Sequence, residues 1–185
     1  MRKRQVERLL REAGKITRES EFFLIGSQAV HAFVSRPPAE VLLSRECDIY
    51  PKNRPQVADF LHQKLGPASR FAREEGFFAD VVTPELVTLP PGWESRVKPL
   101  KYGPVTAWCL DIHDLVVSKL AAGRLKDLEF AAALLEHDLA QRSTLSRRIA
   151  RLDFADDVHR VRSRLQVVLD DIRSARSWSK GRRRK

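Results

Sequence analysis

The sequence contains few of the residues that build disulfide scaffolds, membrane spans or export signals. Its only cysteines are Cys47 and Cys109, each in an apolar context, which argues against a disulfide framework and for a reducing compartment. No apolar run approaches the roughly 20 residues that a membrane helix needs, and the charged first residues lack the apolar stretch of a signal peptide. We therefore expect a cytoplasmic protein with no membrane partner.

Negative charge is also in short supply. The chain has 34 basic against 24 acidic residues and a formal charge of +10, and part of the excess lies in Arg2-Lys3-Arg4 and in 180–185. Basic ends favour association with a polyanion such as nucleic acid, although short terminal runs of this kind also serve as solubility tails.

Apolar periodicity predicts an α/β (α+β) protein in which a mixed, twisted sheet of four to six strands is flanked by helices. The length predicts an α/β core over 1–110, a helical part over 111–177 and a disordered basic tail over 178–185. The final helix carries an apolar heptad stripe that packs on the domain or on a partner helix. We expect helices over 3–13, 56–64 with Phe60 inward, 128–139 and 145–150, and strands over 21–25, 46–50, 69–72, 77–82, 97–100 and 105–110. The stripe comprises Phe154, Val158, Val161, Leu165, Val168 and Ile172.

A strand followed by a glycine turn is the first candidate site. The apolar run ending at Ile25 gives way to Gly26-Ser27 and then to a segment with helix-like composition. Backbone N–H groups at the start of a helix can hold phosphate, and the Ser27 hydroxyl can add to them.

Three carboxylates lie in apolar surroundings. Glu46 and Asp48 are two residues apart in a predicted strand, so they point to the same face. Like charges side by side repel each other, and a bound divalent cation such as Mg²⁺ would offset this repulsion. Asp80 lies between apolar pairs and needs water, a partner or an ion. Other interpretations stay open: Glu46 could pair with Arg45 or a lysine, and Asp80 could cap a strand end.

These residues carry a resemblance to the polymerase-β-like nucleotidyltransferases, and within them to the DUF6036 branch, which is related to AbiEii-type toxins. The superfamily pattern joins a hydrophobic-Gly-Ser turn, two alternating carboxylates and a later third one, here Gly26-Ser27, Glu46 with Asp48, and Asp80. The branch is also similar over 89–97 and, most specifically, over 114–127, the segment DLVVSKLAAGRLKD. The resemblance covers roughly 22–139.

The resemblance implies a polymerase-β-like fold and Mg²⁺- or Mn²⁺-dependent transfer of a nucleoside monophosphate from an NTP to a hydroxyl acceptor. It implies catalytic and metal-binding roles for Glu46, Asp48 and Asp80. Glu46 departs from the usual aspartate and adds a methylene. For Asp114 we prefer helix capping, with Asp111 as the N-cap. The nucleotide-binding residues would be Gly26, Ser27, Lys119, Arg124, Lys126 and Asp127.

Bland alternatives remain for two of the lysines. Lys119 sits among apolar residues, where it could snorkel, and Lys126 could belong to a solvated helix face.

The acceptor and partners follow from charge and resemblance. The basic ends favour RNA, including tRNA, as the acceptor, and a protein acceptor stays open. The distant toxin likeness suggests an antitoxin partner, and the heptad stripe suggests a homodimer. A different class of function is a non-catalytic module that keeps the nucleotide cleft and binds RNA or a partner.

Overall fold

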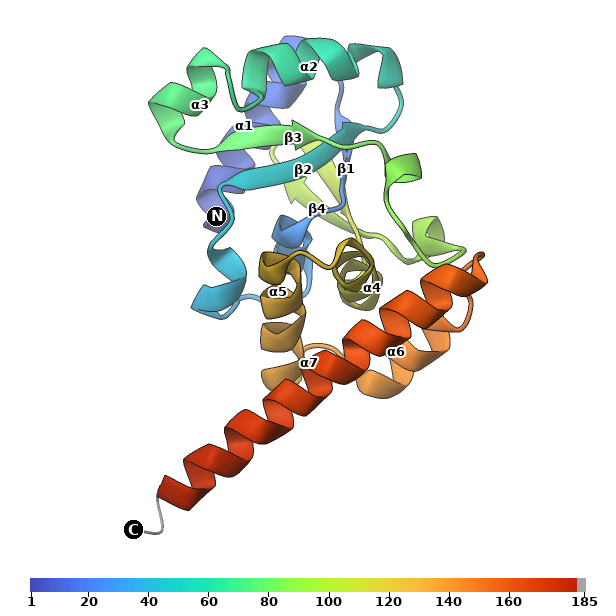
Figure 1. Ribbon diagram of the computed structural model, residues 1–185. Coiled ribbons are helices and arrows are strands. Elements are labelled where there is room, and N and C mark those ends of the chain that lie inside the picture. Colours follow the sequence, from blue (N-terminus) through green and yellow to red (C-terminus); the bar gives the residue numbers. More distant parts are fainter. Residues whose placement is uncertain (183–185) are drawn as a thin grey trace.

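Within the part of the chain that the computed structural model describes, residues 1–182, five strands form one mixed sheet (Figure 1). Their order is β3-β2-β1-β5-β4. The central strand β1 is antiparallel to β2 and parallel to β5, whereas β3 is parallel to β2 and β4 antiparallel to β5. The strands span β1 (Glu21–Leu24), β2 (Glu46–Pro51), β3 (Phe78–Val81), β4 (Lys98–Tyr102) and β5 (Val105–Cys109).

The two faces of the sheet differ in chemistry. In β2, Cys47 and Ile49 are fully buried, and the register places Leu24 of β1 opposite Ile49. Because side chains alternate along a strand, Glu46 and Asp48 project from the other face. The sequence pattern therefore builds one dry face for the core and one face that carries carboxylates.

A first layer of helices covers the dry face. It consists of α1 (Lys3–Thr17), α2 (Ala58–Leu65) and α3 (Arg70–Glu75), drawn on the upper side of the sheet in Figure 1. The predicted apolar face of α1 is confirmed by four fully buried side chains. These are Val6, Leu9, Leu10 and Ala13.

Two expectations about this layer are wrong. The segment predicted as a strand over 69–72 instead begins α3, because the Ser69 hydroxyl accepts a hydrogen bond from the Ala72 N–H and so caps a helix. Phe60 of α2 does not point inward but is 44 % exposed, with the Lys64 ammonium over its ring.

The remaining helices form a second layer below the sheet, on its carboxylate side. They are α4 (Ile112–Ala122), α5 (Leu125–Glu136), α6 (Arg142–Ile149) and α7 (Ala155–Arg182), and the long α7 runs diagonally below α4 and α5 in Figure 1. Their buried side chains join those of the strands in one continuous core. The short 3-10 helices are η1 (Ser27–Ala32), η2 (Ala39–Leu42), η3 (Pro55–Val57), η4 (Pro84–Leu86) and η5 (Trp93–Arg96).

The apolar stripe of α7 packs on this chain's own helices α4, α5 and α6. Phe154, which was expected to start the stripe, precedes the helix and is exposed. The expected tail over 178–185 falls partly on α7, which continues to Arg182, while residues 183–185 lie outside the described residues. The side chains that the stripe buries are Val161, Leu165, Val168 and Ile172.

Arg164 of α7 completes the end of α4. Its guanidinium donates hydrogen bonds of 2.8 and 2.6 Å to the carbonyls of Leu120 and Ala121. A positive charge at a helix C-terminus stabilises the carbonyl end of the helix dipole. Gly123 ends the helix at φ +69°, and a Cβ there would lie 2.2 Å from Arg164 Cζ. The left-handed backbone conformation favours glycine here, and the Arg164 guanidinium occupies the space beside it.

A buried ion cluster ties the segment after β3 to α4. Asp114 is 0 % exposed, and its carboxylate accepts two hydrogen bonds from Arg96, at 2.8 and 3.2 Å. Arg148 of α6 lies 2.8 Å from the same carboxylate and also contacts Asp111. Asp111 caps α4 as expected, but Asp114 is a buried anchor rather than the capping residue that we preferred.

We predict that Asp114→Ala lowers the free energy of unfolding by about 3–5 kcal/mol, because removing one member of a buried ion cluster leaves charges without compensation. Chemical denaturation measures the effect. The matched control is Glu74→Ala, which removes the partner of Arg70 in an exposed pair and should cost less than about 1 kcal/mol. Similar costs for the two variants would contradict the role assigned to Asp114.

Candidate active site

Two predicted carboxylates meet on neighbouring strands. The parallel pairing of β2 and β3 places Asp48 directly opposite Asp80. Residues paired in this way project from the same face of a sheet, on strands about 4.8 Å apart. Glu46 lies two residues earlier on β2 and faces the same side. The structure thus brings together the three carboxylates that the sequence placed in separate segments.

Gly26 is required because Asp48 lies against it. A Cβ built on Gly26 would lie 1.8 Å from Asp48 Oδ2, although the backbone there is extended and suits any residue. The Ile25 N–H donates to the Asp48 carbonyl at 3.0 Å, which fixes the two segments side by side. The glycine of the expected Gly-Ser turn therefore makes room for a carboxylate.

Ser27 opens the 3-10 helix η1, a tighter and shorter element than the helix expected there. It is buried, and its hydroxyl lies 3.2 Å from the side-chain amide of Gln28. A hydroxyl engaged in this way is positioned before any ligand arrives.

The environment of Asp48 disfavours its charged form. Burial raises its pKa from an ordinary value of 3.8 to about 6, the nearby Lys119 opposes this shift, and Glu46 and Asp80 add to it. A carboxyl group with a pKa near neutrality in a cleft is a feature of functional sites. A cation beside Asp48 would reverse the shift.

Lys119 approaches the carboxylates from α4. Its side chain is only 11 % exposed, and its ammonium lies 3.2 Å from Asp127 Oδ1. Asp127 is almost fully buried and also accepts a 2.6 Å hydrogen bond from Arg124. Burial alone would raise the pKa of Asp127, but Arg124 and Lys119 hold it below its ordinary value. Within the DLVVSKLAAGRLKD segment, the buried carboxylate of Asp127 thus orients the side chains of Lys119 and Arg124.

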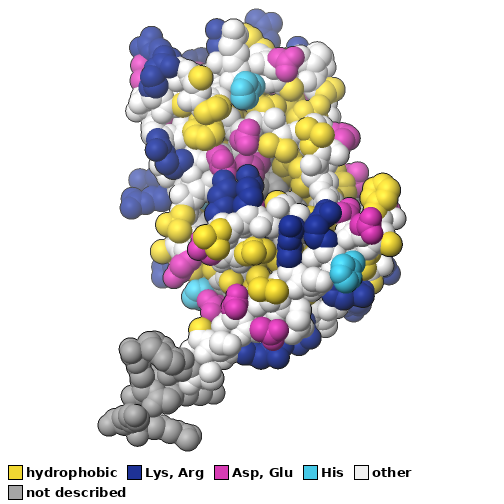
Figure 2. Space-filling view, viewed as in Figure 1, with side chains coloured by type: hydrophobic (Ala, Val, Ile, Leu, Met, Phe, Trp, Pro, Cys, Tyr) yellow, Lys and Arg dark blue, Asp and Glu magenta, His cyan; other side chains and the backbone are white. Residues whose placement is uncertain are grey.

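Lys126 makes the contact that bridges the two layers. Its ammonium lies 2.5 Å from Glu46 Oε1, so a residue of α5 is joined to a residue of β2. The expected alternative that Glu46 pairs with a lysine is therefore confirmed, and the pair includes a residue that lines both cavities of the site. Figure 2 shows acidic side chains gathered directly above basic ones near the middle of this face.

Two cavities open on either side of Glu46 and Lys119, which line both. The smaller, about 380 Å³, is the polar one and includes Asp48, Asp80 and Arg124 in its wall. The larger, about 740 Å³, has a mixed wall that includes Ser27, Lys126 and Asp127. Volumes in this range accommodate small organic ligands. Apolar side chains in the larger cavity are Val41, Leu43, Phe78, Phe130, Ala132 and Ala133.

The carboxylates suit a hard divalent ion by their chemistry. Among residues 1–182, however, no three His, Cys, Asp or Glu side chains stand close enough to form a ready metal site. Glu46 is engaged by Lys126. Asp48 and Asp80 remain side by side on one face.

The sequence did not identify the arginines that bind Asp114 of α4, the helix that carries Lys119. Arg96 lies in a segment that the resemblance singled out, yet its role is to hold the Pro90 and Pro91 carbonyls and Asp114. Arg148 joins the same cluster from α6. The only available signal was an aspartate in an apolar helical segment, which demands a buried partner.

Comparisons with known proteins give one match. The model of a family described as "Nucleotidyltransferase of unknown function (DUF6036)" matches residues 4–167. Neither the curated proteins nor the solved structures yield a match. Among the described residues, no helix combines the length and apolar character needed to cross a membrane.

We predict that Asp48→Asn stabilises the metal-free protein above pH 6. The raised pKa means that the folded protein binds this proton more tightly than the unfolded chain. The contribution of Asp48 to stability therefore falls as pH rises from about 4 to about 6 and is constant above that. The variant should gain up to about 3 kcal/mol at pH 7.5 and little at pH 4.

Urea denaturation across this pH range checks the prediction. Asp171→Asn, which removes one exposed negative charge on α7, serves as the control and should show no such pH dependence. A pH-independent difference between Asp48→Asn and the native sequence would contradict the assigned environment.

Proposed function

The chain belongs to the DUF6036 family of nucleotidyltransferases, and we propose that it transfers a nucleoside monophosphate from an NTP to a hydroxyl acceptor with the help of Mg²⁺ or Mn²⁺. The observation that carries this proposal is the register pairing of Asp48 with Asp80 on the sheet face that Lys119 approaches. Oxygen ligands beside a buried cation match the requirements of phosphoryl chemistry.

The carboxylates Asp48, Asp80 and Glu46 would hold the metal. When bound, a divalent ion neutralises charge on the phosphates and lowers the pKa of an attacking hydroxyl. Gly26 lets the Asp48 carboxylate lie beside the start of η1, where a bound cation could join it to a phosphate. In this proposal the reacting phosphate would lie between the sheet and α4, near Asp48, Asp80 and Lys119.

The cations of α4 and α5 would contact the triphosphate. Lys119 lines both cavities and is held by Asp127. Arg124 is held by the same carboxylate. A preorganised positive charge stabilises negative charge that develops in the transition state. Lys126 can serve the same purpose once it leaves Glu46.

RNA, including tRNA, is the acceptor class that the net charge of +10 favours. A protein hydroxyl is the other acceptor, and a role as a toxin with an antitoxin partner would follow if the modified RNA or protein is essential to the cell. The larger cavity beside Glu46 gives an acceptor or base room to enter.

A non-catalytic nucleotide- or RNA-binding module is the second candidate. The Lys126–Glu46 ion pair favours it, because a lysine resting on a metal ligand is compatible with a site that no longer binds metal. The two candidates differ in one respect: only the enzyme needs the carboxylates for metal binding and for nucleotidyl transfer.

We predict that the purified protein, incubated with each labelled NTP, Mg²⁺ or Mn²⁺ and total RNA or protein, labels one acceptor. Asp48→Asn should abolish labelling, and Lys119→Met should slow it at least about 100-fold, as for loss of a preorganised donor. Asp171→Asn should be unaffected. Absence of labelling with every NTP, together with nucleotide binding that survives Asp48→Asn, would favour the binding module.

We also predict that Lys126→Met binds Mn²⁺ about tenfold more tightly, because the ammonium no longer competes for Glu46. Electron paramagnetic resonance of free Mn²⁺ measures the affinity without any turnover. Lys101→Met, at an exposed position on β4, is the control and should leave affinity unchanged. Unaltered Mn²⁺ binding in Lys126→Met would show that Glu46 is not a ligand.

A further inference from the structure

A second charged surface lies far from the carboxylates, on the outer side of α1. Five basic residues follow one another there at intervals of four, three, four and three. This spacing places the first four on one face of α1, and the fifth is the C-cap residue that follows the helix. They are Arg4, Arg8, Arg11, Lys15 and Arg18, and we call them the basic stripe. All five side chains are exposed.

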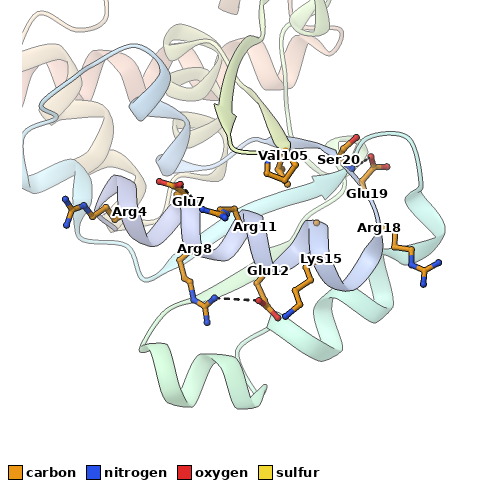
Figure 3. Close-up of a pocket in the computed structure, with 12 residues that line it drawn as sticks. Arg4, Glu7, Arg8, Arg11, Glu12, Lys15, Arg18, Glu19, Ser20 and Val105 are labelled. Atoms are coloured by element: carbon orange, nitrogen blue, oxygen red, sulfur yellow. Dashed lines mark hydrogen bonds and ion pairs between the residues drawn. The ribbon is translucent and has the colours of Figure 1, made fainter.

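The basic stripe borders one hollow. The hollow has a volume of about 740 Å³ and is completed by Ser20, Pro104 and Val105 beside the helix. Figure 3 shows the labelled side chains spread along the whole length of α1. From Arg4 to Lys15 the stripe covers about 17 Å at the rise of an α-helix, and Arg18 lies just past the end of the helix.

Acidic residues in the hollow neutralise the stripe only in part. Arg8 lies 3.7 Å from Glu12 and Arg11 lies 3.6 Å from Glu7, so both pairs are loose. Arg8 also reaches Glu75 at 3.2 Å. Glu7 and Glu12 are half-buried at the flanks of the stripe, whereas the cations project into solvent.

The other acidic residue of the hollow, Glu19, is buried and accepts hydrogen bonds from the backbone N–H groups of Ser20, Glu21 and Asn53. Among the described residues, Arg4, Lys15 and Arg18 have no ion-pair partner. Three of the five cations are therefore available to an anion without breaking any contact.

The stripe lies on the other side of the sheet from the carboxylates. A Cβ at Gly14 of α1 would lie 2.6 Å from Val105 Cγ2, and Val105 belongs to the buried face of the sheet together with Ala107 and Cys109. Asp48 projects from the opposite face. The stripe is thus separate from the proposed nucleotide site.

We propose that the basic stripe binds the phosphate backbone of a nucleic acid strand. A regular row of cations suits a regular row of phosphates, and interfaces with nucleic acid are more positively charged and more polar than those with proteins. This inference does not rest on the proposed function, because the stripe would bind a strand with or without transfer at Asp48.

The surroundings of the stripe disfavour two other polyanions. A protein partner would need an apolar centre to its interface, yet none of the exposed large apolar residues identified in the described chain belongs to α1 or lines the hollow. A lipid surface would need α1 to insert its apolar face, and Val6, Leu9 and Leu10 are fully buried in the core. The exposed apolar residues are Leu43, Phe60, Leu86, Leu125, Phe154 and Val167.

The test is the triple variant R4Q/K15Q/R18Q, which removes the three unpaired cations and leaves every ion pair of α1 in place. The matched control is R142Q/R147Q/R151Q, which removes three exposed cations from and beside α6 and gives the same net charge. Fluorescence anisotropy measures binding of labelled single-stranded RNA and DNA of about 20 nucleotides, in salt between about 50 and 200 mM.

We expect R4Q/K15Q/R18Q to weaken binding about tenfold or more and to reduce the slope of log affinity against log salt by about two, as three lost phosphate contacts on a single strand require. The control should bind within about twofold of the native protein. Equal affinities for RNA and DNA indicate contacts to phosphate alone, and tighter RNA binding indicates an added contact to the 2′-hydroxyl. Either result supports the proposal.

Equal weakening in the two triple variants would overturn the proposal, because net charge rather than the stripe would then decide binding. No weakening in either variant would also overturn it, because the stripe would then make no contact with the strand. Tighter binding of polyglutamate than of RNA, lost in R4Q/K15Q/R18Q, would assign the stripe to an acidic protein and also overturn it. Thermal unfolding and NTP binding should be unchanged in R4Q/K15Q/R18Q, which separates failure of this proposal from failure of the nucleotide site.

Discussion

The contact between Asp48 and Gly26 is the constraint on which the site depends. A carboxylate can lie this close to the backbone only where no Cβ intervenes. The price is a half-buried charge, and burial raises the pKa of Asp48 to about 6. The fold tolerates this because β1 and β2 are tied together beside it by the Ile25–Asp48 hydrogen bond. A site that is costly without a ligand gains stability when a cation arrives, so binding and folding favour the same geometry.

The two lysines beside the carboxylates differ in how deeply they are buried. Lys119 is buried and fixed by Asp127, so its charge is part of the framework. Lys126 is more exposed and rests on Glu46, so its charge can be exchanged for another cation. Asp127 in turn needs α4 and α5 to meet at the correct angle, which Gly123 and Arg164 determine at the end of α4. The C-terminal helix therefore contributes to the site through backbone carbonyls rather than through direct contact.

The sequence predicted the parts of this arrangement that local pattern controls. Alternation placed Glu46 and Asp48 on one face, and the apolar spacing of α1 and α7 was enough to identify their buried sides.

Tertiary partners could not be predicted in the same way. Asp114 looked like a capping residue because capping is local, whereas Arg96 and Arg148 reach it from distant segments. The segment over 69–72 looked like a strand, but a single hydroxyl at Ser69 decides for a helix. The Lys126–Glu46 contact joins residues 80 positions apart, which no local pattern contains.

The two charged surfaces follow from one feature of the fold, the sheet with a dry face and a carboxylate face. Helix α1 covers the dry face and must turn its other side to solvent, where a basic stripe costs little because long side chains keep their charges in water. Near Asp48, by contrast, α4 and α5 meet acidic residues, and Lys119, Arg124 and Lys126 are each paired with a carboxylate. On the outside of α1, three of the five cations have no ion-pair partner among the described residues, so they can attract a polyanion. The cations near Asp48 are held by carboxylates, in positions that suit a small, highly charged ligand. Long-range attraction and local fixation are different tasks, and the sheet keeps the residues that suit each of them on opposite sides.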